Sequence, residues 1–324
     1  MIATILRSSF MRGLLAVAVS AGFLVANPSA EPSASLVGTE VNPETLRGHV
    51  EKLAEDFHPR NYREIDNLNR TADYIAAHFR KAGASVTFQN FNINGNTYRN
   101  VIGRFEGSND SLFVVGAHYD SHEDTPGADD NASGVAGLIE LAYLVGGETG
   151  RSGPTLEFVA YTLEEPPFFN TEEMGSFHHA RSLHERKIDV EGMIALEMIG
   201  YFSDEPNSQS FPSDVFKQFY PSQGNFIGVV GKMDQMEFTR RIKLGMQGAT
   251  PLPVCSLNAP EALPGISYSD HRNYWNFDYP AVMITDTAFF RNPYYHEKGD
   301  VPDTLDYQRM AYVVVAAYNY IVNL

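Results

Sequence analysis

Histidine and carboxylate side chains recur in this sequence directly after short apolar segments. Three such segments are followed by residues of this kind: 112–115 by His118 and Asp120, 156–161 by Glu164 and Glu165, and 193–196 by Glu197. Imidazole and carboxylate groups bind zinc at catalytic sites and transfer protons during hydrolysis. Side chains that follow parallel strands meet in the crevice beyond the C-terminal edge of the sheet, where ligands bind. The spacing therefore predicts one site that contains these five residues.

Each of these features alone has a more ordinary explanation. A single histidine after a strand is usually structural, and an acidic pair usually lies in a solvated turn. A second pair, Glu172-Glu173, lies further along the chain near Gly175-Ser176 and competes for the same assignment. We prefer the pair at 164 and 165 because it follows an apolar segment, whereas acidic residues at 172 and 173 suit the start of a helix.

The rest of the chain alternates between segments typical of strands and of helices. Strands are predicted at 85–88, 98–105, 112–115, 156–161, 193–196 and 281–284, and helices at about 68–82, 132–145, 172–185 and 307–321. This alternation indicates an α/β fold with a mostly parallel sheet, because parallel strands need crossover helices. Residues 202–224 are polar and rich in Pro and Ser, which favours a surface loop or lid.

Composition narrows the possible functions. The chain has 324 residues and a net charge of -16, so it repels phosphate backbones and nucleic acid is excluded as a partner. Cys255 is the only cysteine, which excludes an intrachain disulfide and a thiolate-rich zinc site, and we expect it to be buried and inert. Any zinc must therefore bind to histidine and carboxylate. We expect His178-His179 at the surface.

The N-terminus has the features of an export signal. Arg7 and Arg12 precede an apolar run over 14–25, which is shorter than the roughly 20 residues that a membrane-spanning helix needs. We expect a signal peptide at 1–30, a linker at 31–42 and one catalytic domain at 43–324. The protein would then be exported to the periplasm or secreted, with no membrane association beyond export.

Several motifs together resemble those of the M28 zinc peptidases, a family that includes bacterial aminopeptidases and is related to glutaminyl cyclases. The resemblance runs from about residue 45 to 324 and rests on four motifs: Gly116-Ala117-His118-Tyr119-Asp120-Ser121, Gly127-Ala128-Asp129-Asp130-Asn131-Ala132-Ser133-Gly134, Ser269-Asp270-His271 and Tyr295-His296. It implies a three-layer sandwich in which helices flank a mixed, mostly parallel central sheet.

The resemblance also implies a role for each matching residue. Asp130 would bridge two zinc ions, of which one is completed by His118 and Glu197 and the other by Glu165 and His296. Asp120 would orient the imidazole of His118, Glu164 would be the general base, and the hydroxyl of Tyr295 is a candidate oxyanion donor. One departure is that Pro166-Pro167 follows the first Glu pair, where many members have glycine.

The expected function is that of an aminopeptidase that hydrolyses peptides with a free N-terminus and contains two zinc ions. Three alternatives remain open at this point. A glutaminyl cyclase would hold a single zinc ion, and a non-catalytic binding ectodomain would have lost ligands. A carboxypeptidase or dipeptidase would need a cation for the substrate carboxylate, for which Arg240, Arg241 and Arg272 are candidates.

Overall fold

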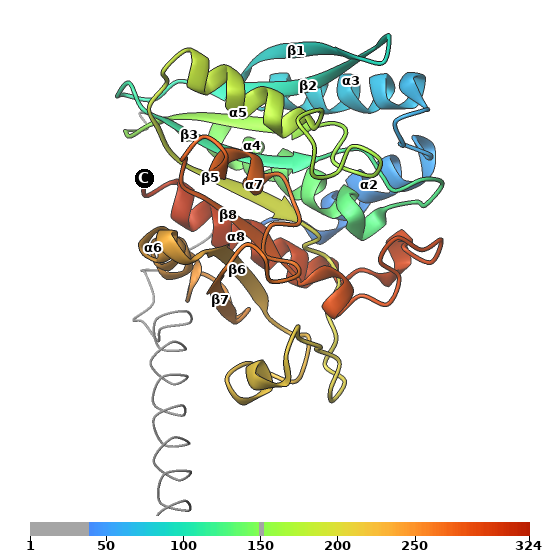
Figure 1. The fold of residues 1–324 in the computed structure, drawn as a ribbon, viewed down its shortest axis with the longest axis vertical. Coiled ribbons are helices and arrows are strands. Elements are labelled where there is room, and N and C mark those ends of the chain that lie inside the picture. The colour runs from blue at the N-terminus through green and yellow to red at the C-terminus, as the bar shows by residue number, and fades with distance from the viewer. Residues whose placement is uncertain (1–38, 149–151) are drawn as a thin grey trace, which may run out of the picture.

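A computed structural model describes residues 39–148 and 152–324, which form one mixed eight-stranded sheet with helices on both faces (Figure 1). The strand order is β1-β2-β4-β3-β5-β8-β6-β7. The strands are β1 (Ser85–Ile93), β2 (Asn96–Phe105), β3 (Leu112–His118), β4 (Thr155–Tyr161), β5 (Val190–Glu197), β6 (Ile227–Lys232), β7 (Val254–Ala259) and β8 (Ala281–Thr285).

The four central strands are parallel and the outer strands make the sheet mixed. The neighbours β4-β3, β3-β5 and β5-β8 pair in parallel, whereas β1-β2, β2-β4 and β8-β6 pair antiparallel. Every residue of β3 and β4 is buried, as expected for strands covered on both faces. The predicted mixed, mostly parallel sheet is confirmed.

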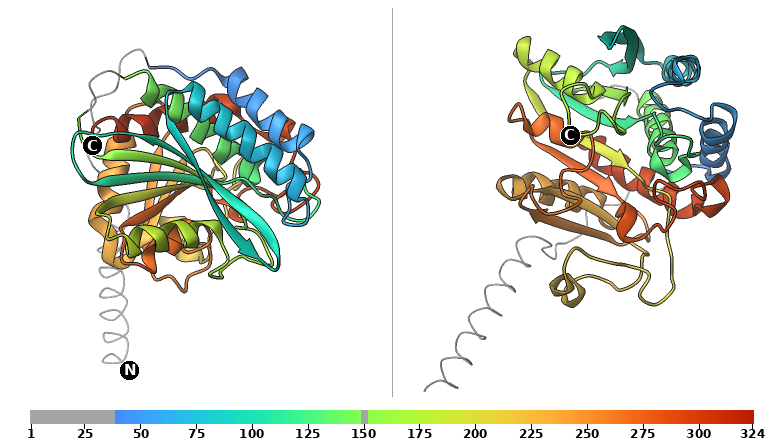
Figure 2. Two further views of the ribbon diagram at one scale, coloured as in Figure 1. Left: turned by 90° about the horizontal axis from the view of Figure 1, so that it is seen from above. Right: turned by 45° about the vertical axis from the view of Figure 1, so that its right-hand side comes forward.

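More helices pack on one face of the sheet than on the other (Figure 2). The helices are α2 (Pro43–Glu51), α3 (Ile65–Lys81), α4 (Gly134–Gly146), α5 (Gly175–Glu185), α6 (Met236–Met246), α7 (His271–Trp275) and α8 (Tyr307–Ile321). Phe113 and Val115 of β3 pack in one core with α2, α3, α4, α6 and α8, whereas Leu112 and Val114 pack in a second core with α5 and α7. Successive strand side chains point to opposite faces, so this division confirms the three-layer sandwich.

Element boundaries differ from the prediction in several places. Helix α3 starts at Ile65, β3 extends to His118, and α5 starts at Gly175 rather than at 172. The helix expected at 132–145 is α4, which begins at Gly134 after a π-helical turn, η2 (Ala128–Ser133), that contains non-helical backbone angles. The sequence did not predict α2, α6, α7, β6 or β7, which are short or lack clear hydrophobic periodicity.

Loops cover β6 and β7 on the face of the sheet that α5 and α7 cover elsewhere. Residues 202–224 join β5 to β6 and contain only one short 3-10 helix, η3 (Asp214–Gln218), in agreement with the predicted surface loop. The predicted signal peptide and linker residues 31–38 lie outside the described residues. Within the described ranges, no helix has the length and apolar character needed to cross a bilayer.

Candidate metal centre

The structure brings the predicted ligands together at the C-terminal edge of the parallel strands. His118 is the last residue of β3 and Glu197 is the last residue of β5. Glu165 follows the end of β4, and Asp130 lies in η2 before α4. His296 reaches the same place from the loop between β8 and α8. Ends of neighbouring parallel strands lie side by side, so the fold places these residues in one crevice.

Asp130 lies between the two histidines. Its Oδ1 atom is 3.4 Å from Nε2 of His118, and its Oδ2 atom is 3.2 Å from Nε2 of His296. Each histidine also faces a glutamate: His118 Nε2 is 3.4 Å from Oε2 of Glu197, and His296 Nε2 is 3.3 Å from Oε2 of Glu165. The five residues therefore form two sets of three donor atoms that share one carboxylate.

The spacing of these donor atoms fits a bound metal ion. Two ligands that each lie about 2.0–2.1 Å from a tetrahedral zinc ion are separated by about 3.3 Å. The observed separations of 3.2–3.4 Å match this value. Nε2 of His118 and Oε1 of Glu165 are buried and have no hydrogen-bond partner. His118, Asp130 and Glu165 offer donor atoms within 4.8 Å of one another, so this donor set could hold a metal ion.

The electrostatics of the cluster also favour a cation. Burial, followed by the charges of neighbouring carboxylates, raises the pKa of Glu164 well above its ordinary value. Burial and the nearby Asp130 raise the pKa of Glu165 to about 8. Burial opposes protonation of His118, but the negative charges of Glu197 and Glu164 outweigh it and raise its pKa. Carboxylates thus outnumber the cations that could neutralise them, and metal ions supply such charge.

Asp120 supports the cluster mainly through the main chain. Its two carboxylate oxygens accept the backbone N–H groups of Glu164 at 3.2 Å and of Glu165 at 3.0 Å. The sequence predicted that this carboxylate orients His118, and Oδ1 lies 3.6 Å from Nδ1 of the imidazole. The backbone oxygen of Asp120 is closer to Nδ1, at 3.2 Å, and is the atom within hydrogen-bond distance. Asp120 therefore fixes the Glu pair with its side chain and His118 with its carbonyl.

Other residues hold the ligands in place and were not predicted for this purpose. Ser269 donates a hydrogen bond of 2.7 Å to Oε2 of Glu197, and the carboxylate of Asp300 accepts the N–H group of Asp130 at 3.1 Å. Arg60 is fully buried and donates to the carbonyls of Tyr119 and Gly127, which flank the two ligand-bearing loops. Ser269 and Asp300 lie in or near the recognised motifs, whereas nothing in the sequence around Arg60 signalled this contact.

Glycine is required at position 127. The residue has φ of 59°, and a Cβ atom there would lie 2.3 Å from the backbone oxygen of Asp130. Left-handed backbone of this kind favours glycine, and the close approach admits no side chain. Gly127 thereby allows the loop to turn tightly before Asp130.

The two Glu pairs lie in different environments. Glu164 and Glu165 are each 5% exposed, and Oε2 of Glu164 is 3.9 Å from Nε2 of His118. Glu172 is exposed and Glu173 is half-buried, and both lie in the turn before α5 rather than in the helix. The structure therefore places the first pair at the cluster and the second pair away from it.

Aromatic rings flank His296. The ring of Tyr295 stacks on it at 3.9 Å with an interplanar angle of 18°, and the ring of His122 stacks on it at 3.9 Å with an angle of 6°. Burial and the surrounding carboxylates raise the pKa of Tyr295, so its hydroxyl keeps its proton. The sequence identified Tyr295 as a candidate but gave no reason to select His122.

The three arginines considered for substrate binding lie in different places. Arg240 and Arg241 are exposed on α6. Arg272 of α7 is half-buried, its Nε atom has no hydrogen-bond partner, and it is attracted by the charges of Glu261 and Glu164. Of these three, only Arg272 lies within electrostatic reach of the cluster.

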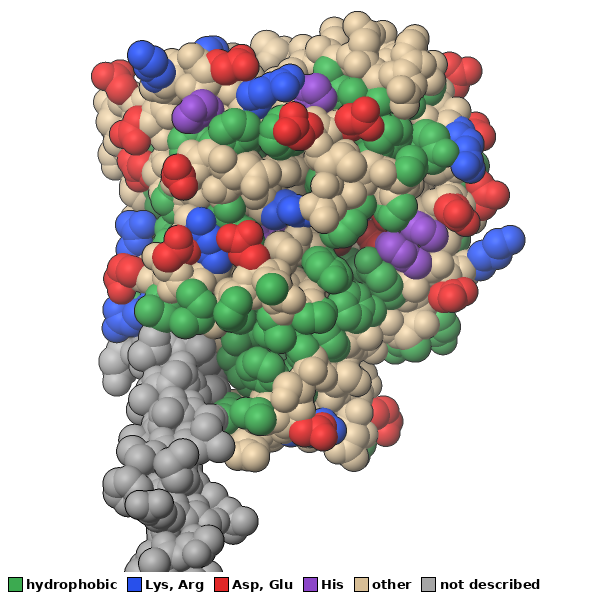
Figure 3. All heavy atoms as spheres, in the orientation of Figure 1, with side chains coloured by type: hydrophobic (Ala, Val, Ile, Leu, Met, Phe, Trp, Pro, Cys, Tyr) green, Lys and Arg blue, Asp and Glu red, His purple; other side chains and the backbone are tan. Residues whose placement is uncertain are grey.

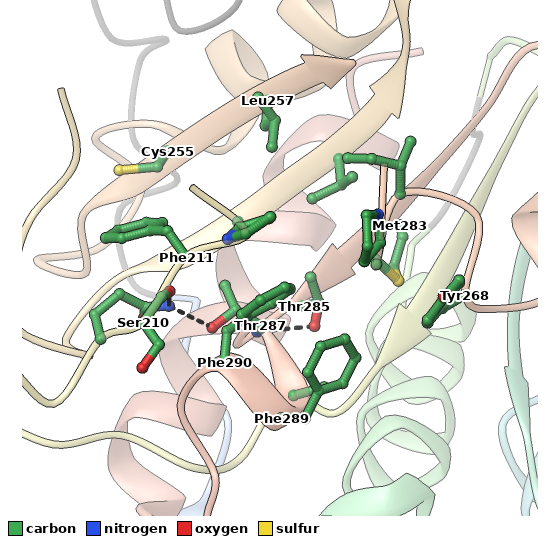
Figure 4. Close-up of a pocket in the computed structure, with 18 of the residues that line it drawn as sticks. Ser210, Phe211, Cys255, Leu257, Tyr268, Met283, Thr285, Thr287, Phe289 and Phe290 are labelled. Carbon is green, nitrogen blue, oxygen red and sulfur yellow. Dashed lines mark hydrogen bonds between the residues drawn. The ribbon is translucent and has the colours of Figure 1, made fainter. Parts of the chain in front are cut away.

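A large apolar pocket adjoins the cluster (Figure 4). Both Glu197 and Tyr295 line it, and the space between its walls, including the part open to solvent, is about 850 Å³. Cys255 lies in its wall and is partly exposed, which differs from the expectation of a fully buried thiol. Concave, mostly apolar surfaces with a few polar groups commonly bind ligands or substrate side chains.

Comparison with known proteins agrees with this geometry. Residues 100–321 match the profile of peptidase family M28. The chain is 47% identical over 281 residues to the uncharacterised protein YfbL of Escherichia coli, a match that covers 84% of this chain and 85% of YfbL. It is 26% identical to leucine aminopeptidase 1 of Metarhizium robertsii, with 82% of this chain and 65% of that protein covered.

Solved structures share the fold at low sequence identity. The zinc aminopeptidase BSAP of Bacillus subtilis superposes with a TM-score of 0.67 at 15% identity, over 87% of this chain and 95% of BSAP. A glutaminyl cyclase of Bacteroides thetaiotaomicron superposes with a TM-score of 0.65 at 18% identity, over 88% of this chain and 99% of the cyclase. The match to the family profile covers more than half of the sequence, and the chain belongs to peptidase family M28.

Proposed function

We propose that this protein is a zinc-dependent aminopeptidase that removes N-terminal residues from peptides. The observation that carries the proposal is the position of Asp130, whose two carboxylate oxygens each face a different histidine. A carboxylate in this position can bridge two metal ions. Family membership supports hydrolysis of peptides, and the leucine aminopeptidases among the relatives support attack from the N-terminus.

Two groups of residues would hold the metal ions. His118 and Glu197 would bind one zinc ion, Glu165 and His296 would bind the other, and Asp130 would bind both. When bound, such a pair of ions lowers the pKa of a water molecule and polarises the scissile carbonyl. The remaining steps depend on side chains of the protein.

Glu164 is the proposed general base. It is buried beside His118 and is not a member of either donor set. Its carboxylate would accept a proton from the attacking water and return that proton to the leaving amine. Burial raises its pKa above that of an ordinary carboxyl group, which makes it a stronger base toward the attacking water.

Two neighbours of Glu164 would assist this chemistry. The carboxylate of Asp120 fixes the main chain of Glu164 through the hydrogen bond to its N–H group. The protonated hydroxyl of Tyr295, which lines the adjoining pocket, would donate a hydrogen bond to the oxyanion. The excess of carboxylates at the cluster would attract the α-ammonium group of a free N-terminus.

We also propose that the protein works outside the cytoplasm. Arg7, Arg12 and the apolar run at 14–25 support a signal peptide at 1–30. Fractionation of cells that produce the full chain, with N-terminal sequencing of the mature protein, tests this proposal. A mature N-terminus at residue 1 in the cytoplasmic fraction would contradict it.

The central experiment is to measure hydrolysis and zinc content in one sample. We expect cleavage of aminoacyl p-nitroanilides, little cleavage of the same substrates after N-acetylation, and about two zinc ions per chain. Equal rates on free and acetylated substrates would overturn the proposal. One zinc ion per chain, together with cyclisation of N-terminal glutamine, would instead identify a glutaminyl cyclase.

Arg272 favours a second candidate, a carboxypeptidase or dipeptidase. A half-buried guanidinium with an unpaired Nε atom near Glu164 could bind a substrate carboxylate. The two functions respond differently to amidation of the peptide C-terminus. An aminopeptidase should cleave tripeptides and their amides at similar rates, whereas the second candidate should lose activity on the amides and on the Arg272→Met variant.

A further inference from the structure

The floor of the apolar pocket is a row of residues that crosses the sheet away from the metal centre. Glu197 of β5 pairs with Thr285 of β8, Thr285 pairs with Gly228 of β6, and Gly228 pairs with Cys255 of β7. Paired residues on neighbouring strands point to the same face of a sheet. The second row, Met283, Val230 and Leu257, lies on the face that α5 and α7 cover elsewhere.

The length of this row sets the depth of the pocket. Neighbouring strands lie about 4.8 Å apart, so the three steps from β5 to β7 span about 14 Å. In Figure 4, Tyr268 and Cys255 lie toward opposite ends of the pocket. The space therefore extends well beyond the reach of a leucine side chain that starts beside the metal centre.

A loop forms the roof over the far end of this floor. We call residues 209–220 the strap. Its Phe211, Phe216 and Tyr220 line the pocket, and Phe211 packs against both other rings at centroid distances of 5.8–6.4 Å. Helix α6 packs on the opposite face of β6 and β7, and no α-helix of the described residues covers the pocket face, so aromatic side chains of the strap supply the apolar cover.

Hydrogen bonds fix the strap at both ends. The buried side chain of Gln209 donates to Oγ1 of Thr287 at 2.8 Å and accepts from Nε of Arg291 at 2.9 Å. At the other end, the hydroxyl of Tyr220 donates to the carbonyl of Ser256 on β7 at 2.7 Å. The strap is therefore held at one end to the loop after β8 and at the other end to the edge of the sheet. These hydrogen bonds fix the depth of the pocket.

The pocket wall is suited to an uncharged apolar group. Among the described residues that line it, Glu197 at the metal centre is the only charged one. The hydroxyl of Thr285 already accepts the N–H group of Thr287 at 2.9 Å. Exposed Tyr268 and Phe289 extend the apolar lining to the surface, where Figure 3 shows a broad hydrophobic area beside histidine. Burial of an aromatic ring here would be favourable, and burial of a charge would not.

We propose that the strap makes this pocket a selector for N-terminal residues with aromatic side chains larger than leucine. This inference rests on the proposed aminopeptidase function, because only the side chain of the N-terminal residue can enter a pocket on the acyl side of the scissile bond. Glu197, shared by the cluster and the pocket, places the entrance next to the reacting carbonyl. The strap residues thus determine which side chain fits.

The first test measures kcat/KM on alanyl, leucyl, phenylalanyl and tryptophanyl amides. A hydrophobic pocket discriminates by about 10-fold or more for each methylene, so phenylalanyl should exceed alanyl by at least about 100-fold and should also exceed leucyl. Faster cleavage of leucyl than of both aromatic substrates would overturn the inference while leaving the aminopeptidase proposal in place.

Two variants should change this preference. Gly228→Val adds a side chain to the floor, where a Cβ atom would lie 3.3 Å from the oxygen of Thr285 and 3.9 Å from two methyl groups. We expect the ratio of kcat/KM on phenylalanyl amide to that on alanyl amide to fall at least 10-fold. Phe216→Ala should lower the ratio of phenylalanyl to alanyl rates by about 10-fold.

The matched control for the strap is Val215→Ala. Val215 neighbours Phe216 in η3 but is 45% exposed and does not line the pocket. Its variant should keep the phenylalanyl to alanyl ratio of the unaltered protein. An equal change of that ratio in both strap variants would show that the loop acts only through general stability, and would overturn the role of Phe216.

The second test uses Cys255 as a reporter that does not depend on catalysis. Because it is the only cysteine, the thiol-specific reagent methyl methanethiosulfonate can label only this position. Burial raises the pKa of its thiol to about 11, so labelling is followed at a pH of about 9 to provide enough thiolate. L-phenylalaninol should slow labelling at least 5-fold, and L-alaninol should have little effect.

The two tests separate the possible failures. Protection by phenylalaninol without hydrolysis of any aminoacyl amide would retain the pocket and remove the aminopeptidase function. Hydrolysis without a preference for aromatic substrates and without protection of Cys255 would retain the aminopeptidase function and remove the proposed role of the pocket. An unreactive thiol in the free protein would contradict a pocket that reaches β7.

Discussion

Two buried glutamates on the same part of the chain, Glu157 and Glu165, have opposite electrostatic environments. Glu157 lies within β4, Glu165 follows its C-terminal end, and each is 5% exposed. Glu157 is paired with Arg104 at 3.0 Å and with His179 at 3.2 Å, which lower its pKa although burial opposes this. Glu165 lies among other carboxylates, and burial with the nearby Asp130 raises its pKa to about 8.

The comparison shows that burial alone does not identify a functional carboxylate. Glu157 has protein partners for its charge, and its partner His179 continues to the hydroxyl of Tyr274 at 2.6 Å. Glu165 has a buried oxygen without a partner. A buried group that the protein leaves unsatisfied indicates a missing ligand, whereas a satisfied one indicates structure. Five experiments can test this distinction.

Removal of metal should have the largest effect. Chelation should abolish activity, because the carboxylates of the cluster would lose both their charge partners and the activated water. Ligands that bind only the folded state at about 1,000 times Kd stabilise it by about 4 kcal/mol, so the apparent Tm should fall by about 10 °C. Inductively coupled plasma mass spectrometry and thermal unfolding measure both effects.

A control variant links this result to the comparison. Glu157→Gln should keep the same zinc content as the unaltered protein, because its side chain is not part of the cluster. Full activity after verified removal of all transition metals would contradict the proposed function.

Glu164→Gln should have the next largest effect. The substitution keeps the size of the side chain and leaves the proposed metal ligands intact. It should lower kcat by about 10²–10⁴, the range for a positioned acid–base group, while zinc content stays unchanged. Glu165→Gln should instead lose part of the zinc, since that carboxylate faces His296. Equal zinc loss in both variants would show that Glu164 is a ligand rather than a base.

Glu157→Gln should affect stability and leave chemistry unchanged. The substitution removes the charge that pairs with half-exposed Arg104, which keeps its contact with Glu106, and with buried His179, so it should cost about 1–2 kcal/mol of the free energy of unfolding. The rate per folded molecule should remain within about 3-fold, because no part of the side chain contacts the cluster. Urea unfolding at neutral pH measures the first effect, and kcat on active-site-titrated enzyme measures the second.

The pH dependence of this stability follows from the lowered pKa of Glu157. A carboxyl whose pKa is depressed by folding stabilises the protein above its unfolded pKa, and this stabilisation is lost as the pH falls through the folded value. The difference in unfolding free energy between the unaltered protein and Glu157→Gln should therefore be full at neutral pH and shrink below about pH 4.5. A difference that grows on acidification would contradict the pairing.

The sequence predicted which histidine and carboxylate residues lie together better than it predicted the contacts that support them. His118, Glu164 and Glu197 could be placed together because each follows an apolar segment. The C-terminal ends of parallel strands lie along one edge of the sheet, where ligands bind. The partners of Glu157 could not be predicted in this way. His179 was expected at the surface, but its side chain is buried and only 1% exposed. Arg60 was missed for the same reason: contacts between distant segments leave no local pattern.

The unpredicted part of the fold has a similar explanation. Strand β7 mixes polar and apolar residues, and β6 contains two glycines, so neither has the continuous apolar run of a central strand. The sequence predicted only a polar loop for the strap, because polar residues separate its aromatic residues. Its role as a pocket roof depends on the arrangement of helices around the whole sheet: among the described residues, α6 covers β6 and β7 on one face only.

The smallest effect is expected at the second Glu pair, and it decides which pair is catalytic. Glu172 is exposed in the turn before α5, so Glu172→Gln removes a solvated charge and should change the free energy of unfolding by no more than about 0.5 kcal/mol. Zinc content and kcat should stay unchanged, in contrast to Glu164→Gln. Glu172 and Glu164 are the same residue type in one loop, so the pair of variants is matched in chemistry and differs in burial and in distance from His118. Loss of turnover in Glu172→Gln with normal turnover in Glu164→Gln would reverse the assignment, and would mean that the loop rearranges to bring the second pair to the metal ions.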